Sequence, residues 1–329
     1  MNFDAFCMYV KEHIHEYLPE DHKEYRVRME DVVKNNVGKL RSFFLKQPGS
    51  GSSPVQYMEL YYEIYQKGIP LDEILSAIAE RQLKLESMKS EITEDMFSIL
   101  EDFNLVKDRI MIWAVGYTLN REMLESVPHK VMGDIAATYR IYFGRDGELE
   151  MSCLLDDRLM RSYGITLDQL HEIAVNNSMH AMPVEITGIN TMMREVTGDG
   201  KIVLHPVNGM LVATYKQNCH GAAIAFYPDV FEKNGIPIDQ YYIAPSSVHE
   251  FMLIPKHLIT LEGANEMIKE INENYVEADE VLSDLAHEYD PVSKQLVIGG
   301  TLERNRTLEV YAIEEPTVLP VSNSPAWGL

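Results

Sequence analysis

The chain is poor in cysteine and in basic residues, and each shortage excludes a class of protein. Its three cysteines are few, odd in number and widely spaced, so they provide neither a disulfide framework nor a paired-cysteine metal site: Cys7, Cys153 and Cys219. Lys and Arg total 29 against 51 Asp and Glu, which gives a formal net charge of −22. A surface of this sign repels the phosphates of nucleic acids and of anionic membranes. We therefore expect neither nucleic acid nor a membrane among its partners.

Segments for export or membrane insertion are also missing. No apolar run approaches the length of a bilayer span, and the first residues lack the basic and apolar parts of a secretory signal. This composition predicts a soluble, cytoplasmic protein, whose 46% hydrophobic residues suffice for a sizeable core. An acidic surface can also imitate nucleic acid, but the densest acidic stretch, VEADEVLSD, covers only residues 276–284. Mimicry is therefore the less favoured hypothesis.

The common catalytic and cofactor motifs are missing as well. None of the His-Glu dipeptides continues to the HExxH of zinc hydrolases; they begin at His15, His171, His249 and His287. His13 and His15 are two residues apart in a predicted helix, so their side chains diverge. The stretch GSGSSP lacks the last glycine of GxGxxG, neither Gly-Lys pair is followed by Ser or Thr, and GxSxG does not occur. We therefore predict no cofactor and no metal site.

Hydrophobic periodicity predicts an α+β fold that begins with a helix and a strand pair, followed by a helical segment. Residues 2–18 have helical spacing, with Cys7 on the core side, and residues 25–33 and 39–46 alternate as a hairpin would. Two amphipathic helices are expected at 54–68 and 71–86. QPGSGSSP, residues 47–54, has the composition of a mobile loop or a short linker.

From about residue 110 the pattern favours a mostly antiparallel sheet region with packed helices. A hairpin is predicted from strands 138–143 and 148–155, with Cys153 on its apolar side, and Thr166 with Gln169 has the spacing of a capping box. In 127–139, Pro128 predicts a helix start before a buried strand. The remaining expected elements are strands 201–205, 210–215, 221–227, 240–244 and 250–255, a helix at 261–275 and a strand pair in 285–299.

These patterns divide the chain into three regions. Residues 1–109 form a helix-rich N-terminal region, and residues 110–303 form an α+β, strand-rich region. Residues 304–329 lack a clear period and are expected to form a poorly structured tail.

The stretch YYIAPSSVHEFMLIP, residues 241–255, raises the question of an active site because Ser247, His249 and Glu250 stand close together. A strand that starts near Val248 would place His249 and Glu250 on opposite faces, so a strand connection is favoured over a catalytic dyad. Whether His249 faces a pocket or the core stays open.

A second candidate is the pair formed by Cys219 and His220. Side chains of adjacent residues diverge, so this thiol would need a histidine from elsewhere in the fold. The catalytic residues are therefore unknown, with weak candidates only: His249, Glu250, Ser247, Cys219 and His220.

The order of segments across roughly residues 1–300 resembles a domain-of-unknown-function family of uncharacterised cytoplasmic proteins from gut Firmicutes, often encoded among accessory or mobile-element genes. The resemblance is carried by GYTLNREMLESVPHKVMGDIAATYRIYF, YGITLDQLHEIAVNN, LVATYKQNCHGAAIAFYPDVF, YYIAPSSVHEFMLIP and LSDLAHEYDPVSKQLV. Residues 166–300 also resemble a second uncharacterised group from bacilli. Neither resemblance implies an activity or site residues.

Two functional hypotheses follow. The first is a non-enzymatic interaction or regulatory protein with a protein partner or self-association, and the missing motifs favour it. The second is a hydrolase or transferase whose polar groups converge only in the folded chain, around Cys219, His220, His249 and Glu250. Whether the protein is an enzyme is uncertain, with the balance toward no.

Overall fold

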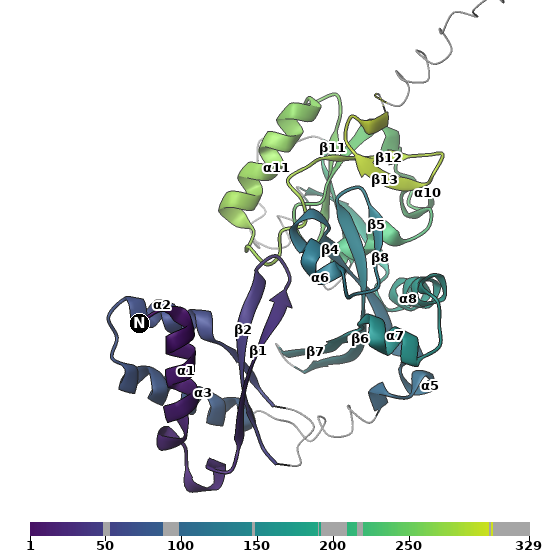
Figure 1. Ribbon diagram of the computed structural model, residues 1–329. Coiled ribbons are helices and arrows are strands. Elements are labelled where there is room, and N and C mark those ends of the chain that lie inside the picture. The colour runs from purple at the N-terminus through teal and green to yellow at the C-terminus, as the bar shows by residue number, and fades with distance from the viewer. Residues whose placement is uncertain are drawn as a thin grey trace, which may run out of the picture.

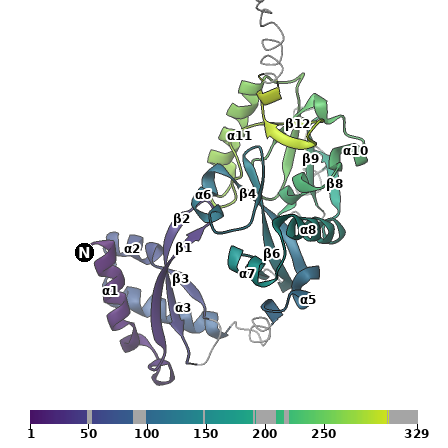
Figure 2. The same ribbon diagram turned by 45° about the vertical axis from the view of Figure 1, so that its right-hand side comes forward.

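The computed structural model describes residues 1–48, 53–87, 99–146, 149–189, 191, 209–215, 220–302 and 304, and it shows an α+β fold (Figure 1, Figure 2). The strands of these residues form three sheets, and every strand pair in them is antiparallel. The predicted fold class is confirmed. The expected strand 201–205 and, apart from Arg304, the expected tail 304–329 lie outside the described residues, and the region boundaries at 109 and 303 stay predictions.

The N-terminal elements build a three-stranded sheet that is covered on one face by helices. The elements are α1 (Phe3–His13), β1 (Arg26–Lys34), β2 (Gly38–Lys46), β3 (Val55–Tyr57), α2 (Met58–Gln66) and α3 (Leu71–Ser87), with short 3₁₀ turns at Ile14–Tyr17 and Glu20–His22. Phe6, Phe43 and Leu75 form the core of this part, together with Cys7, whose burial raises the pKa of its thiol to about 11. Figure 1 shows the β1–β2 ribbon extending from these helices to the rest of the chain.

Two details of this region differ from the expectation. The helix predicted to begin at Pro54 starts at Met58, because Val55–Tyr57 pairs with β2 as an edge strand. The buried amide of Gln56 is satisfied there by the carbonyl of Ile78 and the side chain of Gln82. Residues 49–52 of the predicted loop 47–54 lie outside the described residues.

A second sheet is built on the long strand β6 (Ile135–Asp146), which pairs with β4 (Ile110–Gly116), β5 (Lys130–Met132) and β7 (Leu149–Leu154). Helix α8 (Leu167–Ala181) packs on one face, and it begins with the predicted capping box of Thr166 and Gln169. Alternation along β4 sends Ile112 into this core and Trp113 to the opposite face. Shorter helices surround the sheet: α5 (Phe103–Val106), α6 (Arg121–Leu124) and α7 (Asp157–Ser162), with 3₁₀ turns at Lys107–Arg109 and Thr118–Asn120.

The predicted helix start at Pro128 is wrong. Residues Lys130–Met132 pair with the start of β6 instead, and Gly133 forms the turn between the strands with a φ of +59°. A side chain at Gly133 would collide with the ring of His287, so the turn is specific for glycine.

The third sheet has the strand order β13-β12-β10-β11-β9-β8. Its strands are β8 (Val184–Gly188), β9 (Leu211–Tyr215), β10 (Tyr241–Ala244), β11 (Phe251–Pro255), β12 (His287–Asp290) and β13 (Gln295–Ile298). Helix α11 (Leu261–Tyr275) covers part of it with the bounds that the periodicity predicts, and α10 (Val230–Lys233) and a 3₁₀ turn at Ile238–Gln240 lie in its connections.

The strand predicted at 221–227 is also wrong, because Gly221–Phe226 forms a buried 3₁₀ helix, η5. The chain turns sharply at His220, which has a left-handed φ of +56°. A Cβ atom at Gly221 would overlap the carbonyl of His249 and the hydroxyl of Thr214, so the close approach of the backbone at this turn requires glycine.

The tip of the β1–β2 hairpin is held against the second region by an asparagine clasp, formed by Asn36 and Asn120. The backbone N–H of Asn36 donates to Oδ1 of Asn120, and Nδ2 of Asn120 donates back to Oδ1 of Asn36, both at 2.7 Å. Nδ2 of Asn36 donates to the carbonyls of Ala278 and Val281. The clasp therefore joins segments that are 84 and more than 240 residues apart in the sequence.

Removal of one amide of the clasp is expected to destabilise the protein. In Asn120→Ala the backbone N–H and Oδ1 of Asn36 lose their partners, which should lower the free energy of unfolding by about 1–3 kcal/mol in urea denaturation. Asn274→Ala, on the exposed face of α11, is the control and should change it by less than about 0.5 kcal/mol. Equal unfolding free energies of the two variants would contradict a stabilising role of the Asn36–Asn120 pair.

Candidate functional site

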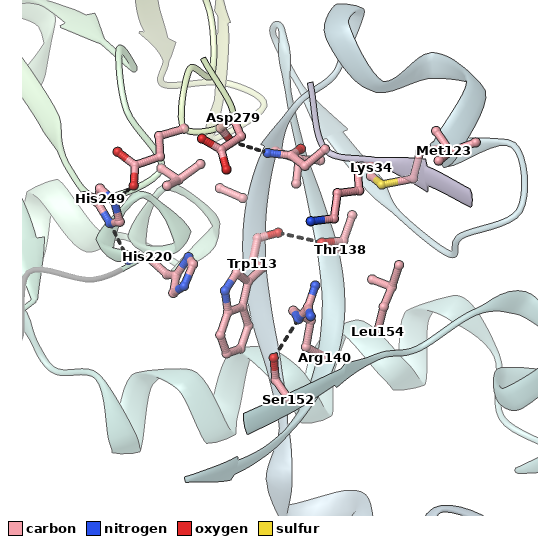
Figure 3. A pocket seen from close by; sticks show the side chains of 16 residues that line it. Lys34, Trp113, Met123, Thr138, Arg140, Ser152, Leu154, His220, His249 and Asp279 are labelled. Carbon is pink, nitrogen blue, oxygen red and sulfur yellow. Dashed lines mark hydrogen bonds and ion pairs between the residues drawn. The ribbon is translucent and has the colours of Figure 1, made fainter. Parts of the chain in front are cut away.

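A cavity of about 570 Å³ lies beneath the hairpin tip, on the face of the β4–β6 sheet opposite α8 (Figure 3). Five parts of the chain line it: the hairpin tip, strands β4, β6 and β7, helix α6, the loops that carry His220 and His249, and the segment before Val281. We call it the clasp pocket. Its lining residues are Val33, Lys34, Asn35, Trp113, Ala114, Val115, Met123, Thr138, Arg140, Ser152, Leu154, His220, Val248, His249, Asp279 and Glu280.

Trp113 forms the aromatic base of the clasp pocket. Its ring centroid lies 4.8 Å from that of His220, and the guanidinium carbon of Arg140 lies 5.8 Å from the Trp113 ring. Nε of Arg140 donates to the hydroxyl of Ser152 at 2.9 Å, which fixes the direction of the guanidinium. Thr138, the partner of Trp113 in the β4–β6 register, donates its hydroxyl to the backbone carbonyl of Trp113. The result is a flat aromatic surface with a cation above it.

His249 lines the pocket rather than the core, which answers the question that the sequence leaves open. The backbone N–H of His220 donates to Nδ1 of His249 at 3.2 Å. An amide can donate only to an unprotonated ring nitrogen, so the ring proton is on Nε2, which lies 3.0 Å from Oε1 of Glu280. Both nitrogens of His249 are therefore engaged, and neither is left to accept a proton from a ligand.

The other sequence candidates occupy different places. His220 lines the pocket next to His249, with 5.8 Å between their ring centroids. Ser247 is buried, and its hydroxyl accepts the backbone N–H of His249 in the connection between β10 and β11. Glu250 does not line the pocket, and burial raises the pKa of its carboxyl. Cys219 lies outside the described residues.

Charges of opposite sign stand on opposite sides of the clasp pocket. Figure 3 shows Asp279 and His249 on one side and Lys34 and Arg140 on the other, with Trp113 between them. Glu280 belongs to the acidic side through its contact with His249. The acidic stretch 276–284 therefore contributes pocket groups, in addition to solvated surface.

Sequence reasoning missed Trp113, Arg140 and Glu280. The available signals were a tryptophan within an apolar strand and an arginine within the apolar run TYRIYF. A strand has two faces, and only the fold shows that this face is left open to a cavity.

A separate polar cluster lies between the second and third sheets; Asp134, Ser283 and His287 are buried in it, and the exposed Thr118 joins it from outside. The carboxylate of Asp134 accepts from the hydroxyl of Ser283 at 2.9 Å and from the backbone N–H and hydroxyl of Thr118. The backbone N–H of Asp134 donates to Nε2 of His287 at 2.8 Å. Burial lowers the pKa of His287 to about 4, so this ring is neutral and structural.

Neither a membrane-spanning helix nor a cluster of metal ligands occurs among the described residues. None of the helices in these residues combines the length and the apolar character of a bilayer span. No group of three or more His, Cys, Asp and Glu side chains in the same residues is arranged to hold a metal ion.

Fold and site together define an α+β protein in which a β-hairpin closes an aromatic pocket with charges of both signs. Residues 3–291 match the sequence model of the Family of unknown function (DUF5688), and the chain belongs to this family. No curated protein and no solved structure matches the chain. Because the description of the family names no activity, it gives no role to any pocket residue.

The buried ring of His287 predicts a loss of stability in acid. Its pKa is about 4 in the folded protein against 6.5 for an exposed histidine, so between these pH values the unfolded chain binds a proton that the folded chain does not. Relative to His287→Gln, the wild type should lose about 3 kcal/mol of unfolding free energy as the pH falls through this window. Above pH 6.5 the difference should be constant. Urea denaturation of both proteins at several pH values measures this difference in unfolding free energy. A difference that stays the same from pH 4 to pH 7 would contradict a neutral, buried His287.

Proposed function

We propose that this protein is a non-enzymatic regulatory protein that binds a small zwitterionic ligand in the clasp pocket. The observation that carries the proposal is the arrangement of charge: cations on one side of Trp113 and carboxylates on the other. A ligand with an anionic group, a flat or apolar body and a cationic group matches this order. The volume of about 570 Å³ is typical of a small-molecule site.

Each part of such a ligand has a defined partner. The guanidinium of Arg140 is oriented by Ser152 and can bind a carboxylate with two parallel hydrogen bonds. The indole of Trp113, only 7% exposed, supports an aromatic or aliphatic body. Oxygens of Glu280 and Asp279 accept hydrogen bonds from an ammonium group, which binds best where it can pair with a carboxylate.

The geometry of His249 supports binding over catalysis. A general base needs a nitrogen that can take a proton, whereas Nδ1 accepts the His220 amide and Nε2 faces Glu280. In this arrangement His249 holds Glu280 in place, so the carboxylate meets a ligand in one fixed orientation.

The regulatory part of the proposal rests on the hairpin tip. Val33, Lys34 and Asn35 form one wall of the pocket, and the tip that carries them is held by the asparagine clasp and by the bond from Nδ2 of Asn35 to the carbonyl of Asp279. A ligand that contacts this wall binds the docked state more tightly than the undocked state and shifts the balance toward docking. Ligand concentration would then control how the N-terminal region is presented to a protein partner or a second copy of the chain.

The alternative, a hydrolase or transferase around Cys219, His220, His249 and Glu250, is favoured by one observation, the presence of both histidines in one pocket. Its test is hydrolysis of p-nitrophenyl esters by the wild type and by Cys219→Ala and His249→Gln. Loss of a measurable rate in both variants would favour the enzyme over the binding protein. The wider setting that the resemblance implies, a cytoplasmic accessory protein of gut Firmicutes, stays a prediction.

Binding of three matched probes tests the proposed ligand class. The chain has two tryptophans, so a Trp327→Phe background leaves Trp113 as the fluorescent reporter. L-Phenylalanine should bind about tenfold more tightly than 3-phenylpropionate, which lacks the ammonium group, and than 2-phenylethylamine, which lacks the carboxylate. Titration of Trp113 fluorescence measures the three affinities.

Two variants should remove these preferences separately. Glu280→Gln should bind L-phenylalanine and 3-phenylpropionate equally, and Arg140→Gln should bind L-phenylalanine and 2-phenylethylamine equally. Arg161→Gln, an exposed arginine of α7, has the same charge change as Arg140→Gln and should leave all three affinities unchanged. Equal affinity of the wild type for the three probes would overturn the zwitterion proposal.

A further inference from the structure

A second cavity, of about 310 Å³, lies on the β1–β2 ribbon at the end away from the hairpin tip, and its lining is basic. It is formed by Arg26 and Arg28 of β1, Lys46 of β2, and Gln47 with Pro48. Arg26 stands directly opposite Lys46 in the strand register, and Arg28 follows two residues later on the same face. The three cationic side chains therefore share one surface. None of the five residues belongs to the clasp pocket.

Among the described residues, no carboxylate pairs with the charges of this cluster. On the same ribbon Lys39 and Arg41 both form ion pairs with Asp31. Arg26, Arg28 and Lys46 form no ion pair within the residues that the structure describes. Glu30 lies next along this face but does not line the cavity.

Like charges directly opposite each other destabilise a strand pair, so the Arg26 and Lys46 pairing has a cost in the unliganded protein. That cost is unexpected in a chain with 51 acidic residues against 29 basic ones, where carboxylates are abundant. A bound anion would offset it. Sites that break a local rule in this way are often functional.

We propose that this cavity binds a phosphate group. Two arginines and a lysine provide planar forks and a point charge, the combination that matches the oxygens and the double charge of phosphate. A long polyanion is disfavoured because the net charge of −22 repels it beyond the cavity. The phosphate is therefore free inorganic phosphate or the phosphate of a small ester.

Isothermal titration calorimetry of the full chain at low ionic strength tests the site with inorganic phosphate, pyrophosphate and adenosine monophosphate as probes. All three probes should bind, and replacing the buffer salt with chloride at equal ionic strength should not weaken their binding. Arg26→Gln/Arg28→Gln should weaken phosphate binding by at least about tenfold. Equal affinity for phosphate and adenosine monophosphate points to free phosphate as the ligand, and tighter binding of adenosine monophosphate points to an ester.

Arg158→Gln/Arg161→Gln on α7 is the matched control, because it removes the same charge from two exposed arginines. It should bind phosphate as the wild type does. Without phosphate, Arg26→Gln/Arg28→Gln should melt at the wild-type temperature or about 1–2 °C higher, because a repulsion has been removed. Absence of phosphate binding to the wild type, equal weakening in the control, or a lower melting temperature of Arg26→Gln/Arg28→Gln would overturn the proposal.

Discussion

The reciprocal amide pair of Asn36 and Asn120 is the interaction on which the site depends. It holds a hairpin from the first 50 residues against strands and loops that come much later in the chain. Together with the bond from Nδ2 of Asn35 to the carbonyl of Asp279, it places Val33, Lys34 and Asn35 as one wall of the clasp pocket, opposite the face of the β4–β6 sheet that carries Trp113. An asparagine suits this place because its side chain both donates and accepts, and because it tolerates the left-handed φ of +57° at the turn.

Residues 278–283 connect the clasp, the pocket and the buried cluster. The carbonyls of Ala278 and Val281 accept from Asn36, Glu280 faces His249, and Ser283 donates to Asp134. Val281 also bridges to Ser247, so the connection between β10 and β11 is tied to the same segment. One short segment therefore contacts both the hairpin tip and the pocket residue His249, so the proposed regulation would act through it. This is the physical basis of the proposed regulation.

Most of the fold could be predicted from the sequence, because periodicity and caps are local properties. The capping box at Thr166 and the bounds of α11 are examples. The errors at 221–227 and after Pro128 have a different origin: Gly221 and Gly133 lie against His249 and His287, which are distant in sequence. Only part of the site could be predicted, because the pocket also depends on contacts between residues that are distant in sequence. His249 and His220 stood out as polar residues between apolar runs. Trp113 and Arg140 line the pocket only because α8 leaves their face of the sheet uncovered, and the sequence does not show which face that is.

Hydrogen exchange of the Asn36 backbone amide tests the central claim most directly. This N–H lies in the half-buried hairpin turn, and its hydrogen-bond acceptor is Oδ1 of Asn120. The account predicts slow exchange in the free protein, slower exchange with saturating L-phenylalanine, and fast exchange in Asn120→Ala under both conditions. Exchange of the wild-type amide at the rate of an unprotected turn, with no response to L-phenylalanine, would contradict it.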